Sequence, residues 1–181
     1  DVPTAASQSE ISVAEGSKTV SSSVGGVNLL TNDTKGADGA RVHDISYTNS
    51  AGIPVSASVP TGAAGVTVTT LYGSLTVKSD GTWSYTSTTV ISHANGQFVQ
   101  DDFTYRIIDN DGDISLAATQ PIKVTDTEPS IGTPENTNVY EASLLTGSAP
   151  DNALLSKTGS LDVTKAADAI ETKFVNATVD A

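Results

Sequence analysis

Apolar and polar residues alternate in short stretches along this chain, and clusters of Gly, Asn and Asp separate the stretches. The apolar positions are mostly Val, Ile and Ala. Alternation of this kind is typical of strands that bury one face. The expected strands cover residues 19–30, 42–47, 66–71, 74–77, 82–85, 103–108 and 114–124.

The clearest local signal is a hairpin over residues 71–85. Leu75 and Val77 alternate with polar residues before an Asp-Gly turn, and Trp83 and Tyr85 alternate after it. The single tryptophan is expected in the core. Several short strands spaced by turns predict an all-β fold, a Greek-key β-sandwich of immunoglobulin or cadherin type.

The chain also contains a loose internal repeat. The spacing of Pro3, Val13 and Glu15 recurs 126 residues later, and residues 34–38 resemble residues 164–168. A period of this length is the size of a domain, so the pattern predicts a tandem repeat.

The repeat divides the chain into a complete part and an incomplete part. Residues 1–126 are expected to form one complete sandwich, and residues 127–181 a linker with the opening portion of a second, incomplete repeat. A sandwich without its later strands has open edges. The second part is therefore expected to be loosely ordered or completed by another chain, as in a segment of a longer array.

Charge and composition narrow the function. The chain has 9 Lys and Arg against 21 Asp and Glu, a net charge of −12, and no cysteine, which excludes disulfides and thiolate metal sites. Such a surface repels phosphate backbones and anionic lipid, so nucleic-acid binding is not expected. The sequence contains no apolar run of 18 residues, so membrane insertion is not expected. Of the 21 acids, 15 are Asp, the shorter carboxylate, which favours divalent metal binding.

Catalysis has little support in the sequence. The two histidines, His43 and His93, accompany no nucleophile in a strained turn and no glycine-rich phosphate loop. We expect surface or half-buried histidines and no enzymatic activity.

One acidic loop has the pattern of a cation site. Asp109, Asp111 and Asp113 occupy alternate positions in a tight turn, where their oxygens can converge on a hard cation. The alternative is a turn whose side chains cap their own backbone. Calcium is the favoured interpretation, because three like charges within one turn repel one another unless they are neutralised.

Topology groups the acids at two ends of the expected sandwich. We call one group the upper pole: Asp1, Asp33, Asp38, Asp109, Asp111 and Asp113. We call the other the lower pole: Glu15, Asp101, Asp102, Asp126 and Glu128. In an array, each junction would bring the lower pole of one repeat against the upper pole of the next. Calcium there would stiffen the linker.

The ordered motifs at residues 28–33, 72–85, 102–105 and 109–113 resemble the cadherin-like tandem repeats of giant bacterial RTX adhesins exported by type I secretion. The resemblance covers residues 1 to about 128. It implies an extracellular, calcium-rigidified extender at the bacterial cell surface that contacts neighbouring repeats and supports attachment and biofilm formation. The glycine-rich RTX nonapeptides do not occur in this sequence.

A second function class remains open at this point. The chain could itself be a module that binds carbohydrate or peptide, with the loop 86–100 as the candidate surface through Ser92, His93, Asn95 and Gln97. An extender predicts ions at the poles, whereas a recognition module predicts an ion or groove on the side.

Overall fold

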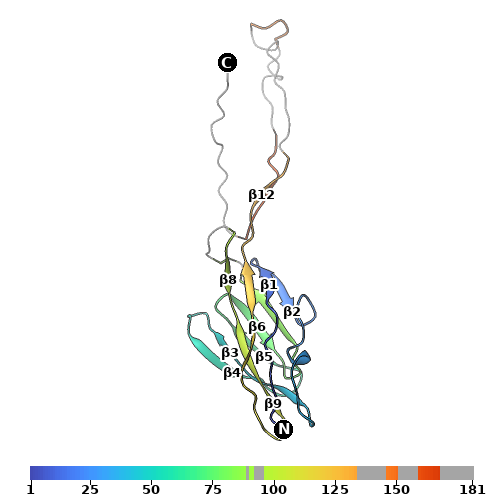
Figure 1. The fold of residues 1–181 in the computed structure, drawn as a ribbon. Helices are drawn as coiled ribbons and strands as arrows, with labels where there is room; N and C mark the ends of the chain where they lie inside the picture. The colour runs from blue at the N-terminus through green and yellow to red at the C-terminus, as the bar shows by residue number, and fades with distance from the viewer. Residues whose placement is uncertain (89, 92–95, 134–145, 151–158, 168–181) are drawn as a thin grey trace. The chain divides into compact units, whose positions relative to one another are not determined.

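The computed structural model describes residues 1–88, 90–91, 96–133, 146–150 and 159–167 of this chain. These residues are nearly all in strands, turns and extended segments. The chain divides into two compact units, Asp1–Thr127 and Glu128–Ala181 (Figure 1). Each unit is described by itself.

The first unit contains eleven strands in its described residues and one short 3-10 helix, η1. In chain order the elements are β1 (Ile11–Ala14), β2 (Thr19–Ser21), η1 (Leu29–Thr31), β3 (Ala40–Thr48), β4 (Pro54–Ser58), β5 (Val66–Thr69), β6 (Gly73–Val77), β7 (Trp83–Ser87), β8 (Phe98–Gln100), β9 (Phe103–Asp109), β10 (Ala118–Gln120) and β11 (Ile122–Thr125).

These strands form an all-β sandwich, as the sequence predicts. Two sheets have four strands, in the orders β10-β9-β3-β4 and β2-β7-β6-β5, and a third has the order β1-β11-β8. All pairings are antiparallel except β1 with β11, which is parallel and aligns Ile11 with Ile122. The immunoglobulin or cadherin type of the sandwich stays a prediction.

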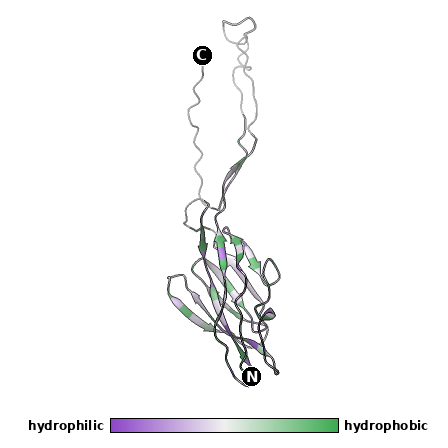
Figure 2. Ribbon diagram, in the orientation of Figure 1, coloured by the Kyte–Doolittle hydropathy of each residue, from purple (hydrophilic) through white to green (hydrophobic). Residues whose placement is uncertain are grey.

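The core lies between the sheets. Leu75, Val77, Trp83 and Tyr85 point inward from the β6–β7 hairpin, and each is at most 3% exposed. The Trp83 ring meets Phe103 of the facing sheet edge-on, with ring centroids 5.9 Å apart. Figure 2 shows how hydrophobic and hydrophilic residues alternate along the strands. This alternation buries one face of each sheet and exposes the other.

Two expected strands are shorter than the pattern predicts, for local reasons. The run 19–30 keeps its strand only to Ser21, because the chain then turns and enters η1, which the Asn28 side chain caps. The run 114–124 breaks at Pro121, which cannot donate to a ladder. The strand before it pairs with β9, and the strand after it pairs with β1 and β8. The short strands β1, β4 and β8 are additional to the expected set.

The ends of the first unit are fixed by strand register. At one end Ala40, where β3 begins, pairs with Asp109, where β9 ends. The N-terminal segment reaches the same end, because Thr4 pairs with Thr34 (Figure 1). At the opposite end β1 and β11 finish side by side. The upper-pole and lower-pole groups of this unit therefore lie at opposite ends, as the topology predicts.

The second unit contains a two-stranded antiparallel ladder in its described residues. β12 (Ser130–Ile131) pairs with β13 (Val163–Thr164), and Gly132 N–H donates to the Asp162 carbonyl at 2.7 Å. No described residue of this unit is buried. The predicted repeat matches at Val139, Glu141 and Asp168 lie outside the described residues.

Candidate functional site

The turn after β9 is closed by its own groups. Asp109 N–H donates to the Asp113 carbonyl at 3.1 Å, and Asp113 N–H donates to Asp109 Oδ1 at 2.8 Å. This is the self-capping arrangement that a turn predicts, and it accounts for one oxygen of Asp109. The Asp109 residue is only 4% exposed. Its second oxygen, Oδ2, is buried and has no hydrogen-bond partner.

Asp38 lies against this turn from the segment that precedes β3. The Asn110 side-chain amide donates to the Asp38 carbonyl, which ties the two segments together. Gly36, at a φ of +75°, allows this segment to turn close to Asp1: a Cβ at Gly36 would lie 3.5 Å from the Asp1 Cβ and from Asp38 Oδ1. Asp38 Oδ2 is buried and unpartnered, like Asp109 Oδ2.

Asp33 stands earlier in the same segment and faces Tyr105, four residues before Asp109 on β9. Its Oδ1 accepts a hydrogen bond from Ala6 N–H at 2.8 Å and lies 3.2 Å from the Tyr105 hydroxyl. Its Oδ2 is buried without a partner. Burial raises the pKa of Asp33 above its ordinary value, against hydrogen bonds from Ala6 and Tyr105 that lower it.

The unpartnered oxygens separate the upper pole into two groups. In the part of the chain that the structure describes, every buried side-chain nitrogen or oxygen atom without a hydrogen-bond partner belongs to Asp33, Asp38 or Asp109. The other predicted ligands of this pole, Asp1, Asp111 and Asp113, are exposed. The sequence spacing of 109, 111 and 113 therefore singles out one buried carboxylate and two solvated ones.

At the lower pole, Asp101 is the centre of a hydrogen-bond network. It is 3% exposed, and its Oδ2 accepts from the Thr70 hydroxyl at 2.6 Å, the Tyr85 hydroxyl at 2.6 Å and Tyr72 N–H at 3.0 Å. Burial, with the neighbouring Asp101 carboxylate, raises the pKa of Tyr85. Gly73 is required beside this network, because a Cβ there would lie 2.5 Å from the Tyr85 ring.

Glu15 follows β1 and is fully buried. Its Oε2 accepts from Ile91 N–H at 2.9 Å, and its Oε1 accepts from the backbone N–H and the hydroxyl of Thr127 at 3.3 and 3.2 Å. Both carboxylate oxygens thus have donors from the same unit. Glu15 holds the chain that leaves β11 to the end of β1.

The remaining predicted lower-pole ligands are more exposed. Asp102 Oδ1 accepts from Ile122 N–H at 2.9 Å, and Asp126 Oδ2 accepts from Gly96 N–H at 3.1 Å. Glu128 belongs to the second unit and is exposed.

The two poles differ in how well they suit a hard cation. Calcium prefers carboxylate and carbonyl oxygens, and a buried oxygen without a donor is available to it. Only the upper pole has such oxygens among the described residues. The described ion pairs join Asp44 to Arg106 and His43, so none of them includes a pole carboxylate, although the charge of Lys35 acts on Asp33 and lowers its pKa against the effect of burial. No described group of three or more acidic or histidine side chains has the arrangement of a ready-made metal site.

Some residues at the upper pole were not singled out by the sequence. Asn110 and Tyr105 position Asp38 and Asp33. Asn110 stands inside the acidic motif, which is a usable signal. Tyr105 gives no local signal, because its partner is 72 positions away. The half-buried His43 lies at a bulge in β3, whereas His93, Ser92 and Asn95 of the predicted recognition loop lie outside the described residues.

Comparison with known protein families finds no family model that matches this chain, and comparison with curated proteins finds no match. Among the described residues, no helix has both the length and the apolar character needed to cross a membrane.

Proposed function

We propose that the first unit is a calcium-binding, non-enzymatic repeat of an extracellular bacterial adhesin, and that calcium binds at its upper pole. The observation that carries this proposal is the presence of buried, unpartnered carboxylate oxygens on Asp33, Asp38 and Asp109. Buried polar atoms normally have partners, and a buried charge without one is costly. A bound divalent cation would supply the missing partner.

Calcium at this pole would neutralise carboxylates from two separate segments. Asp38 precedes β3 and Asp109 ends β9, so a counter-charge shared by these two carboxylates would tie the loop before one strand to the turn after its neighbour. The hydrogen bond from Asn110 to Asp38 already holds these segments together. The expected consequence is a stiffer end to the sandwich, because repulsion between the acids is removed.

The adhesin assignment rests on the resemblance of the ordered motifs to RTX adhesin repeats. In that setting the chain would be exported by type I secretion, contact neighbouring repeats and hold a binding tip away from the cell, which supports attachment and biofilm formation. Extracellular calcium modules bind with a Kd of about 10⁻⁴ to 10⁻³ M. Weak binding of this order suits carboxylates that are partly hydrogen-bonded by the protein.

The lower pole receives a different role in this proposal. Glu15 and Asp101 are satisfied by donors of the same unit, so their burial needs no ion. We assign Glu15 to holding the segment that follows β11, and Asp101 to holding the β6–β7 hairpin in place. Asp102, Asp126 and Glu128 remain predicted ligands of a junction with another repeat.

Calorimetric calcium titration tests the proposal. The wild type is compared with Asp33→Asn/Asp38→Asn/Asp109→Asn, which keeps side-chain size but removes three anionic ligands. The matched control is Asp111→Asn/Asp113→Asn, which removes exposed charge from the same pole. We expect the triple variant to lose calcium binding and the control to keep most of it. Equal binding by all three proteins would overturn the assignment of the site.

A further inference from the structure

On the outer face of the sheet β2-β7-β6-β5, the strands themselves carry hydroxyl groups and no charge. The outward positions of its four strands form two rows across the sheet, and all eight are Ser or Thr: Thr19, Thr86, Ser74 and Thr69 in one row, and Ser21, Ser84, Thr76 and Thr67 in the other. None of the four strands contains a charged residue. In a chain with a net charge of −12, acids are thus kept off this face.

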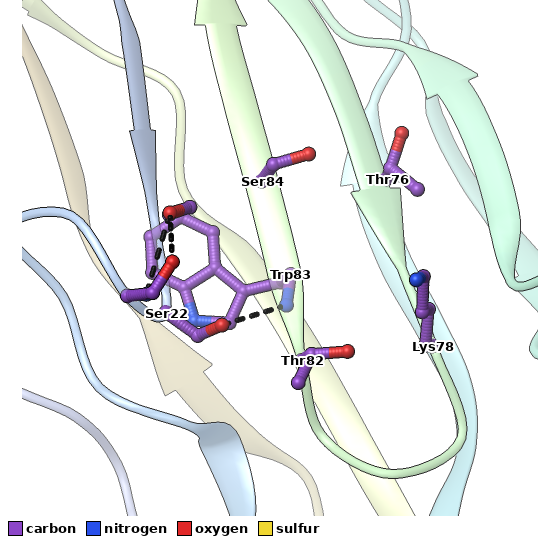
Figure 3. Close-up of a pocket in the computed structure, with 8 residues that line it drawn as sticks. Ser22, Thr76, Lys78, Thr82, Trp83 and Ser84 are labelled. Carbon is purple, nitrogen blue, oxygen red and sulfur yellow. Dashed lines mark hydrogen bonds between the residues drawn. The ribbon is translucent and has the colours of Figure 1, made fainter. Parts of the chain in front are cut away.

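A hollow of about 380 Å³ opens on this face, and six of its eight lining residues are Ser or Thr. Its residues are Ser21, Ser22, Ser23, Thr76, Lys78, Thr82, Trp83 and Ser84. Figure 3 shows Ser84 on β7 and Thr82 just before it, beside Thr76 on β6 and Lys78 just after β6, with Ser22 near the Trp83 ring. The hollow is an open depression of the surface and not an enclosed cleft.

Among the described residues that line the hollow, Lys78 is the only one with a charged side chain, and its charge also acts on the nearby Asp80 carboxylate. Its ammonium group makes no ion pair or hydrogen bond within the described part of the chain. The Asp80 carboxylate accepts hydrogen bonds from the N–H and hydroxyl of Thr82, at 2.9 and 2.6 Å, and makes no direct ion pair with Lys78. Gly65, at a φ of +67°, leaves room for the lysine stem, since a Cβ there would lie 2.8 Å from the Lys78 Cγ.

Two hydroxyls of the hollow, on Ser84 and Thr76, have hydrogen-bonding capacity to spare. Ser84 Oγ has no hydrogen-bond partner among the described residues, and the Thr76 hydroxyl shares one bond with Thr67 at 2.9 Å. Each hydroxyl has one proton and two lone pairs, so Ser84 and Thr76 keep capacity for a ligand, whereas Thr82 donates its proton to Asp80 and can only accept. Trp83 is 3% exposed, so a ligand cannot stack on its ring. Recognition in this hollow must come from hydrogen bonds and one positive charge.

From this combination we propose that the hollow binds an acidic saccharide, a sugar that carries a carboxylate or sulfate group. Lys78 meets the anionic group, and the hydroxyls of Thr76, Thr82 and Ser84 meet sugar hydroxyls. The site lies on the side of the sandwich, on a sheet face rather than at either pole. It goes beyond the extender role, because it gives the repeat a ligand of its own.

Binding at one such site is expected to be weak, because no aromatic ring contributes and water competes for every hydroxyl. NMR titration of the ¹⁵N-labelled chain suits weak binding and locates it. The probes are oligogalacturonate for the carboxylate, sulfated dextran oligosaccharide for the sulfate, and uncharged dextran oligosaccharide as the neutral comparison. All titrations are made at one fixed calcium concentration and repeated with chelator, to exclude calcium bridges to the acidic poles.

Matched variants identify the contacts. Lys78→Gln is compared with Lys18→Gln, which removes the same charge from an exposed position outside the hollow, and Thr76→Val with Thr69→Val. We expect Lys78→Gln to weaken binding of a charged probe about tenfold or more, as loss of a charge-assisted hydrogen bond should. Thr76→Val should weaken it severalfold, and both controls should leave it unchanged.

The carboxylate and sulfate probes decide which anion the hollow prefers, and binding of either one with these variant effects supports the proposal. Three results would overturn it: no shift with either charged probe, equal binding of the neutral probe, or equal losses in Lys78→Gln and Lys18→Gln. Calcium binding in each variant is measured in parallel. Retained calcium binding separates failure of this site from failure of the upper-pole assignment.

Discussion

The two poles of the first unit carry acids of the same kind, yet they satisfy them differently. At the lower pole Asp101 accepts three hydrogen bonds on one oxygen, and Glu15 accepts bonds on both. At the upper pole Asp33 and Asp109 are each hydrogen-bonded through Oδ1 only, and their Oδ2 atoms are buried without a hydrogen-bond partner. A cluster of acidic residues can thus be either a structural network or a cation site. The positions of the donors decide between them, because a carboxylate surrounded by N–H and O–H groups needs no metal.

The largest expected effect is a loss of stability when the hydrogen-bond network of the lower pole is disrupted. Asp101→Ala removes the acceptor of Thr70, Tyr72 and Tyr85 and leaves buried donors unsatisfied, at about 1–3 kcal/mol each. We expect the free energy of unfolding to fall by at least about 3 kcal/mol, by the same amount in calcium and in chelator. Denaturant unfolding under both conditions measures this. A loss confined to calcium would instead identify Asp101 as a ligand.

The next largest effect is on calcium-dependent stability, when three carboxylates of the upper pole are replaced. In Asp33→Asn/Asp38→Asn/Asp109→Asn the calcium-dependent part of the stability should vanish. A ligand that binds only the folded chain contributes about 2.7 kcal/mol at 100 times its Kd. Without calcium, the variant should be as stable as the wild type or more stable, because repulsion is relieved. Thermal unfolding with Asp111→Asn/Asp113→Asn as the control gives the comparison, and an unchanged calcium shift in the triple variant counts against this pole.

A smaller effect concerns the chain exit at the lower pole. Glu15→Gln keeps one acceptor oxygen and places an NH2 group against either Ile91 N–H or the donors of Thr127. We expect a loss of about 1–3 kcal/mol that does not depend on calcium. Hydrogen exchange should rise at Ile91 or at Thr127, whichever faces the new NH2 group, and remain level in the β6–β7 hairpin. Protection equal to that of the wild type at both Ile91 and Thr127 would show that Glu15 does not hold the segment after β11.

The smallest expected effect is a pH dependence at Asp33. Burial raises the pKa of its carboxyl in the folded chain, so the folded state binds more protons than the unfolded state between the two values. Calcium-free stability should therefore fall as pH rises from the ordinary Asp value through the raised one. Asp33→Asn should flatten this part of the curve. Solvent screening keeps the amplitude small, and a wild-type curve that rises through the same window would contradict the raised pKa.

Much of the fold could be predicted from local pattern. The hairpin at 71–85, the inward Trp83 and the grouping of acids at two ends follow from alternation, an Asp-Gly turn and strand order. The break at Pro121 is readable from the sequence, but the change of sheet across it depends on pairings with β9 on one side and β1 on the other.

The sequence could not predict which acidic residues are satisfied by hydrogen bonds and which have unpartnered oxygens. Whether a carboxylate is free depends on distant donors, such as Ile91 N–H for Glu15 and the Tyr85 hydroxyl for Asp101. Alternate spacing gave Asp109, Asp111 and Asp113 equal weight, although only the first is buried. The hydroxyl face could be suspected strand by strand from alternating Ser and Thr. Its two rows require the register of four strands.

The most direct test of the upper-pole account is the melting temperature of the wild type and of Asp109→Asn, each measured in millimolar calcium and in excess chelator. Asp109 is the most buried of the three carboxylates with an unpartnered oxygen. The account predicts that calcium raises the melting temperature of the wild type by several degrees, and that the rise shrinks markedly in Asp109→Asn. No calcium-dependent rise in the wild type, or the same rise in both proteins, would contradict it.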